Sequence, residues 1–158
     1  MSIFELAIPI VLRHEGGYVW DANDPGGETN FGISKRSYPS IDIKNLTVEG
    51  ATEIYRRDFW DKYGYGKIQA QAVAAKIFDS AVNMGAPRAH TLAQAVLGVV
   101  QDGVLGPKTL GELNAMPSMK FILAYQEQMA QFYRRLVLLN PARQEFLKGW
   151  LNRAYDRA

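Results

Sequence analysis

Residues 13–33 have the sequence RHEGGYVWDANDPGGETNFGI, in which a helical pattern gives way to a turn-rich one. An apolar run ends at Leu12, and two glycines follow Glu15, so a helix is predicted to stop there. The next residues are rich in Gly, Asp and Asn, which are typical of turns. Phe31 and Ile33 are the best candidates for a short strand that follows. The stretch thus predicts a helix end beside a small β element.

Helical patterns fill most of the remaining chain. Ser2 and Glu5 have the spacing of a capping box, which places a helix start at Ile3, and Pro9 should kink that helix or begin a second one. Thr47 is a candidate N-cap for the next helix. The further helices are expected over residues 48–63, 70–84, 87–98, 107–114, 118–139 and 141–155. The predicted fold is mainly α (α+β), a helical bundle with a small β-hairpin beside the loop.

Composition narrows the classes of protein. At 158 residues and 47% hydrophobic, the chain can form one compact unit. We expect two parts packed as that unit, residues 1–70 and 71–158. The absence of cysteine excludes disulfides and thiolate metal sites. Two histidines are too few to suggest a metal site, and we predict no cofactor. A net charge of +2 does not suggest a nucleic-acid binder, although it favours approach to an anionic polymer.

The apolar N-terminal run is predicted to be a core helix rather than an export signal. Glu5 interrupts residues 3–12, no basic segment precedes them, and no small-residue cleavage site follows. The run is also far shorter than the ~20 residues that span a bilayer. We therefore expect the protein to stay in the cytoplasm in which it is made until another component releases it.

Three residues of the opening stretch are candidates for acid–base chemistry. Glu15 follows the helix, where the helix dipole disfavours an acid, so its placement suggests a function, although a solvated surface residue is the alternative. Asp24 and Thr29 could together hold a water molecule, the carboxylate accepting its proton and the hydroxyl orienting it. Asp24 also belongs to an ordinary turn sequence, and Asp21 and Glu28 are rival second carboxylates. Two carboxyl groups facing each other across a sugar are what glycosidic cleavage requires.

Other residues are candidates for substrate contact. Aromatic rings stack on sugars, and polar side chains bind their hydroxyl and acetamido groups. Asp79 and Asn83 lie four residues apart and share one helical face, although Asn83 could instead help to end its helix. The candidate substrate-binding residues are Tyr18, Trp20, Asn30, Asp79 and Asn83.

Basic residues gather near the C-terminus: Arg134, Arg135, Arg143, Lys148, Arg153 and Arg157. Such a run is typical of a solvated helix face. An amphipathic helix that contacts a membrane is the alternative. We favour the first interpretation, because the apolar residues between these charges can pack on the core.

The motifs of both halves resemble one family. Residues 15–18 (EGGY) and 23–39 (NDPGGETNFGISKRSYP) are similar to glycoside hydrolase family 108, which comprises phage endolysins and bacterial N-acetylmuramidases. Residues 78–85 (FDSAVNMG) and 101–109 (QDGVLGPKT) resemble the predicted peptidoglycan-binding region that accompanies that family. The resemblance covers nearly the whole chain and implies a lysozyme-like fold.

The resemblance implies a reaction, a substrate and a cellular location. The family's acid falls on Glu15, and the substrate is the MurNAc–GlcNAc β-1,4 bond of bacterial peptidoglycan. A T-even phage lysozyme pattern of Glu, Asp and Thr is matched at Glu15 and Asp24, but Thr29 comes one residue early. If Asp24 and Thr29 direct water, the reaction inverts the anomeric centre. Lysis of the host and release through a holin into the periplasm follow from the same resemblance. We also expect the protein to be a monomer.

Two alternatives to hydrolysis stay open at this point. A lytic transglycosylase would use the same acid without a water-directing partner and would form an anhydro sugar. A non-catalytic peptidoglycan-binding module would bind the wall without cutting it. Whether the source is a phage, a prophage or a bacterium is equally open.

Overall fold

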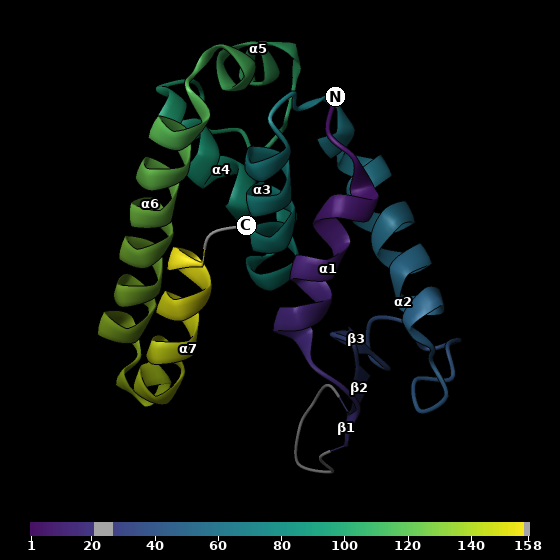
Figure 1. The fold of residues 1–158 in the computed structure, drawn as a ribbon. Coiled ribbons are helices and arrows are strands. Elements are labelled where there is room, and N and C mark those ends of the chain that lie inside the picture. The colour runs from purple at the N-terminus through teal and green to yellow at the C-terminus, as the bar shows by residue number, and fades with distance from the viewer. Residues whose placement is uncertain (21–26, 157–158) are drawn as a thin grey trace.

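A computed structural model describes residues 1–20 and 27–156 of the chain. The described part is mainly helical with one small antiparallel sheet, which confirms the predicted fold class (Figure 1). The elements are α1 (Phe4–Glu15), β1 (Val19–Trp20), β2 (Glu28–Asn30), β3 (Ile33–Ser34), α2 (Val48–Tyr55), η1 (Arg56–Asp61), η2 (Tyr65–Lys67), α3 (Gln71–Met84), α4 (Ala86–Leu97), α5 (Pro107–Ala115), α6 (Ser118–Leu139), η3 (Pro141–Arg143) and α7 (Gln144–Tyr155).

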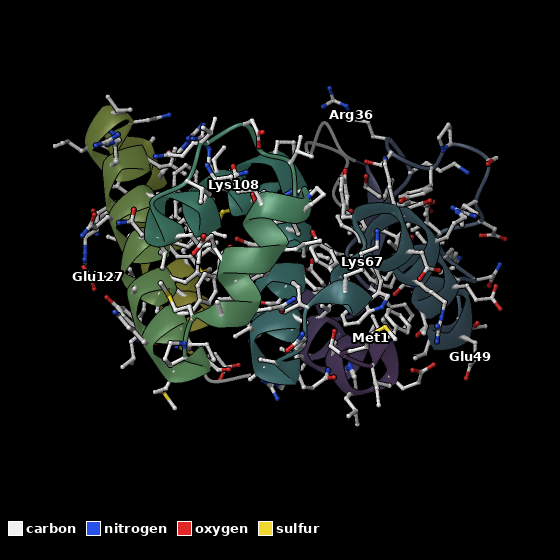
Figure 2. The ribbon with its side chains drawn as sticks, turned by 90° about the horizontal axis from the view of Figure 1, so that it is seen from above. Met1, Arg36, Glu49, Lys67, Lys108 and Glu127 are labelled. Carbon is white, nitrogen blue, oxygen red and sulfur yellow. The ribbon has the colours of Figure 1, made fainter. Side chains whose placement is uncertain are left out.

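Helix α3 lies at the centre of the molecule, with α1 and α2 on one side and α6 and α7 on the other (Figure 1). Phe78 of α3 is fully buried, and its ring centroid lies 5.4 Å from that of Trp60 and 6.0 Å from that of Phe4. These edge and tilted ring contacts are the preferred aromatic geometries. Seen from above, Glu49 and Glu127 mark opposite ends of the molecule, with Met1 and Lys67 between them (Figure 2).

The start of α1 differs from the predicted capping box. The N-cap is Ile3, and no side chain caps it. The Ser2 hydroxyl instead donates to the carbonyl of Tyr65, and Glu5 pairs with Arg56. The Gln71 side chain of α3 accepts from the Ile3 N–H and donates to its carbonyl, so a neighbouring helix, and not a local capping box, holds the start of α1. Pro9 lies inside one continuous helix and begins no second one.

The small sheet has the order β1–β2–β3, one strand more than the predicted hairpin. Ile33 is a strand residue as predicted, but Phe31 is not. Phe31 and Gly32 form the turn between β2 and β3, with φ angles of 50° and 77°. Two-residue hairpin turns of this kind need positive φ at both positions, which the bulky Phe31 disfavours. The hydroxyl of Tyr55 donates to the Phe31 carbonyl at 2.7 Å and holds the turn in place.

The segment 48–63 was predicted as one regular helix. Thr47 caps it as predicted, with its hydroxyl accepting from the Gly50 N–H at 3.1 Å. The α-helical part ends at Tyr55, however, and Arg56–Asp61 is a π-helix. The wider turn places Trp60 in the core beside Phe78. Side-chain periodicity alone could not predict this change of helix type, because π-helical turns are rare.

The buried side chain of Lys76, in α3, links that helix to α7. The side chain is only 2% exposed, and its ammonium donates to the carbonyls of Arg153 and Asp156, each at 2.8 Å. These carbonyls lie at the C-terminal end of α7, where a cation is favoured by the helix dipole. Burial lowers the pKa of Lys76 to about 8, despite the opposing attraction of Asp79 and Asp156. The last helix is therefore tied to the centre of the molecule.

This lysine predicts a pH dependence of stability. Its pKa is lower in the folded chain than the ordinary 10.5, so the unfolded chain binds more protons between these values and the free energy of unfolding rises with pH. We expect the difference in free energy of unfolding between wild type and Lys76→Met to increase by about 2 kcal/mol from pH 7.5 to pH 10. Urea unfolding at both pH values measures it. A difference that stays flat or falls with pH would contradict the assignment.

The C-terminal helices form an antiparallel pair, in which α7 packs along α6 (Figure 1). The ring of Trp150 stacks on that of Tyr133, with centroids 5.3 Å apart. Among the described helices, none is long and apolar enough to cross a membrane.

Candidate active site

Glu15 is the last residue of α1, and the chain turns away immediately after it because Gly16 has a φ of 71°. The side chain is 18% exposed, so it lies at a surface that solvent reaches only partly. One carboxylate oxygen, Oε1, is 2.7 Å from Nη1 of Arg153, which is on α7. This contact is an ion pair without hydrogen-bond direction, and Oε1 accepts no hydrogen bond from the described residues. Oε1 itself is buried, so Arg153 holds this edge of the carboxylate away from solvent, and the exposed part of the side chain lies elsewhere.

The other side of Glu15 is bounded by the hairpin turn. A Cβ atom at Gly32 would lie 2.5 Å from Oε2 of Glu15 and 2.5 Å from the hydroxyl oxygen of Tyr55. Only glycine therefore allows the turn to approach this closely. Burial, and secondarily the charge of Glu15, raises the pKa of Tyr55, which keeps its hydroxyl protonated as a donor to the Phe31 carbonyl. The carboxylate is fixed between the turn and α7.

Gly32→Ala is expected to damage this arrangement. The methyl group would push Glu15 or Tyr55 aside, at a cost of about 1–3 kcal/mol, in addition to about 1 kcal/mol for the left-handed backbone. Gly27→Ala is a matched control, because Gly27 has a φ of 67° but a Cβ there would meet no atom of the described residues within 4 Å. Peptidoglycan cleavage should fall about tenfold or more for the first variant only. Equal activity of the two variants would contradict the close packing.

A buried network continues from Glu15 through Arg153. Arg153 is 9% exposed, and its Nε and Nη2 donate to the two carboxylate oxygens of Asp79 at 3.1 and 2.8 Å. Nδ1 of His14 lies 2.9 Å from Oδ1 of Asp79, and its Nε2 lies 2.9 Å from Oδ2 of Asp156. Burial alone would raise the pKa of Asp79, but the hydrogen bonds from His14 and Arg153 lower it. Asp79 is thus an ionised, buried anchor for the guanidinium.

The partners predicted for Glu15 are only partly within the described residues. Asp24 and its rival Asp21 lie outside them. Thr29 is in the central strand β2, paired with Val19 and with Ser34. The remaining rival, Glu28, accepts a hydrogen bond from the hydroxyl of Tyr18 at 3.0 Å. The roles of Asp24 and Thr29 therefore stay predictions.

The predicted substrate-binding residues fall into two groups. Tyr18 and Trp20 are exposed on or beside β1, and Trp20 is 66% exposed, which suits stacking on a sugar. Asn30 and Asp79 are buried: Asn30 donates to the carbonyls of Ile43 and Leu46, and Asp79 holds Arg153. Their contacts favour positioning roles, and direct substrate binding by either stays a prediction.

The fifth predicted residue, Asn83, is half-buried near the end of α3. Its Oδ1 accepts from the hydroxyl of Tyr133. That bond turns the amide oxygen toward Tyr133 and leaves the nitrogen without a partner among the described residues. Substrate binding by Asn83 stays a prediction.

The motif of residues 101–109 holds its own loop together. The Gln94 amide of α4 donates to Oδ1 of Asp102 at 2.7 Å and to the carbonyl of Val104 at 3.0 Å, and its oxygen accepts from the N–H of Gly103 at 2.8 Å. The Gly103 carbonyl also accepts from Nδ1 of buried His90 at 2.8 Å. The polar groups of this motif are therefore occupied by internal contacts.

Sequence reasoning missed three residues of the site: Arg153, Tyr55 and Gly32. The basic run near the C-terminus, which includes Arg153, is predicted to be a solvated helix face, and no role is predicted for Tyr55 or Gly32. A usable signal was present in α3, where Asp79 follows Phe78 inside an apolar run. A carboxylate in such a position requires a cation, because an unpaired buried charge is very costly.

In the described residues, no group of three or more His, Asp or Glu side chains could hold a metal ion.

The helical bundle with a small sheet beside the end of α1, where Glu15 lies, is a lysozyme-like arrangement. Residues 8–85 match the family model "Glycosyl hydrolase 108", and residues 88–155 match "Predicted Peptidoglycan domain". The solved structure of Brucella abortus SagA is 34% identical and has a TM-score of 0.78, with 96% of this chain and 88% of that chain covered. The chain belongs to glycosyl hydrolase family 108. No curated protein matches it.

The family membership confirms the resemblance and gives the coarse function, a glycoside hydrolase that acts on peptidoglycan. The two matched regions meet between residues 85 and 88, within the helical part of the chain. The division at residue 70 stays a prediction.

Proposed function

We propose that the protein is an N-acetylmuramidase that hydrolyses the MurNAc–GlcNAc β-1,4 bond with Glu15 as the general acid. The observation that carries this proposal is the placement of Glu15. Its carboxylate is fixed by Arg153 and the Gly32 turn, and yet the side chain is still 18% exposed. An acid must reach the leaving oxygen at hydrogen-bond distance, and a fixed side chain that solvent still reaches partly can do so.

The second half of the reaction needs a water molecule. In the proposed mechanism, Glu15 protonates the glycosidic oxygen while Asp24 accepts a proton from water and Thr29 orients it. Water then attacks the anomeric carbon from the opposite face, the glycosidic bond breaks, and the configuration inverts. Thr29 lies in β2, the strand that leads into the Gly32 turn beside Glu15, and this position supports its role. Lysis of a bacterial host, release through a holin and action on the periplasmic wall are part of the same proposal and rest on the family resemblance.

Product analysis tests the reaction type. Purified peptidoglycan is digested, and the fragments are examined by mass spectrometry and by NMR of the newly formed anomers. Reducing-end MurNAc fragments that carry one added water, first seen as the α-anomer, are expected. Reducing-end GlcNAc would place the cut at the other glycosidic bond. Anhydro-MurNAc ends would move the protein to the lytic transglycosylases, and binding without cleavage would favour a wall-binding module.

A further inference from the structure

The largest pocket described lies against α7, beside the Glu15–Arg153 pair. Its volume is about 460 Å³, and its lining includes Gly149, Trp150, Asn152 and Arg153 of α7 together with His14 and Asn83. Arg153 contacts Glu15, and His14 is the neighbour of Glu15 in the chain, so two lining residues lie between the pocket and the carboxylate. The volume falls within the range of small-molecule sites and can hold a sugar ring with its substituents.

The pocket wall offers polar groups that other side chains do not use. Asn83 accepts from Tyr133 through Oδ1, which leaves its N–H groups without a partner among the described residues. The side chain of Asn152 makes no hydrogen bond to the described residues. Carboxamides both donate and accept, as the hydroxyl and acetamido groups of an amino sugar require of a partner. The indole of Trp150 adds an apolar surface.

Charge favours a neutral ligand in this pocket. Arg153 is paired with Asp79 and Glu15, and His14 with Asp79 and Asp156, at distances of 2.7–2.9 Å for the closest atoms of each pair. The guanidinium and the imidazole in the wall therefore already have carboxylate partners. A peptide stem, with its own carboxylates, would find no free positive charge there, whereas a neutral N-acetylated sugar needs none.

We propose that this pocket is a saccharide subsite that binds an N-acetylhexosamine unit of the glycan strand next to the bond at Glu15. The inference rests on the proposed function and adds a role for α7, within the region matched by the predicted peptidoglycan domain. The glycan crosses Glu15 and continues over α7, where Asn83 and Asn152 bind its polar substituents. Gly149 leaves room for the ring, since a Cβ there would meet no atom within 4 Å.

Gly149 allows a test that spares the fold. Gly149→Phe would place a ring in the pocket, whereas Gly149→Ala adds only a methyl group, and either residue suits a helix better than glycine. Both are made in a Glu15→Gln background, in which Arg153 stays held by Asp79. Thermal melts should show both variants to be folded. Binding of peptide-free glycan strands and of stem-bearing muropeptides is measured by calorimetry.

We expect Gly149→Phe to weaken binding of both ligands at least about tenfold relative to Gly149→Ala. Weakening confined to the stem-bearing ligand would overturn the proposal in favour of a peptide site. Equal binding by the two variants would overturn it while leaving the proposed function intact. If neither variant nor the Glu15→Gln parent binds either ligand, and wild type also yields no cleaved glycan, the proposed function fails together with the subsite.

Discussion

Replacing Glu15 with Gln is expected to lower the rate of peptidoglycan cleavage about 10²–10⁴-fold, because the glycosidic oxygen loses its proton donor. The glutamine keeps the size of the side chain and can still fill the space between Arg153 and Gly32. Folding should change little, since Asp79 continues to hold the guanidinium. Cleavage is measured by release of reducing ends from purified peptidoglycan, and folding by thermal melts.

Glu5→Gln is the matched control on the same helix. Glu5 is exposed near the other end of α1 and pairs with Arg56, far along the chain from the hairpin turn. Its replacement should leave cleavage within about twofold, as surface ion pairs contribute little. Full activity of Glu15→Gln in a folded protein would remove Glu15 from the reaction, whichever carboxylate then replaced it.

Replacing Arg153 with Met is expected to cost about 3–5 kcal/mol of stability, because it leaves the buried carboxylate of Asp79 without its main partner. Asp79 is 1% exposed and would retain only the contact with His14 among its charged neighbours. Cleavage should fall as well, since Glu15 loses the group that fixes Oε1. Urea unfolding and the reducing-end assay measure the two effects separately.

A double variant separates stability from chemistry. In Asp79→Leu with Arg153→Met, the buried carboxylate is removed together with the guanidinium that paired with it, and much of the lost stability should return. Activity should not return, because Glu15 still lacks Arg153. Recovery of both properties would show that Arg153 acts on stability alone. Arg153→Lys is expected to recover little of either, since an ammonium cannot reproduce the forked contacts of a guanidinium.

The local features of this fold could be predicted because they depend on neighbouring residues. The helix stop at Gly16, the Thr47 cap and the turn after Glu15 all follow from short-range patterns. The capping box at Ser2 failed for an instructive reason. Gln71, 68 residues away, bonds both backbone groups of Ile3, and no local pattern could have predicted that replacement.

The candidate site likewise combines residues that local sequence can predict with contacts that it cannot. Glu15 could be predicted from its motif, and the exposed Trp20 from its position in the loop. The contacts that fix Glu15 join residues that are distant in sequence: Arg153 and Asp79 are separated by 74 positions. In a list of charges near the C-terminus, nothing distinguishes a buried arginine from solvated ones. The partner is identifiable only once the packing of α7 on α3 is known.

The ties between α3 and α7 also bear on how such enzymes can be recombined. Lys76 and Asp79 belong to the first matched region and Arg153 to the second, so a chimera joined at residues 85–88 would pair one parent's buried charges with another parent's last helix. Unless the donor supplies an arginine and two helix-end carbonyls in the same places, the hybrid would carry unpaired charges in its core. The two regions therefore depend on each other for folding. Domain swaps that aim at a new host range should exchange both regions together.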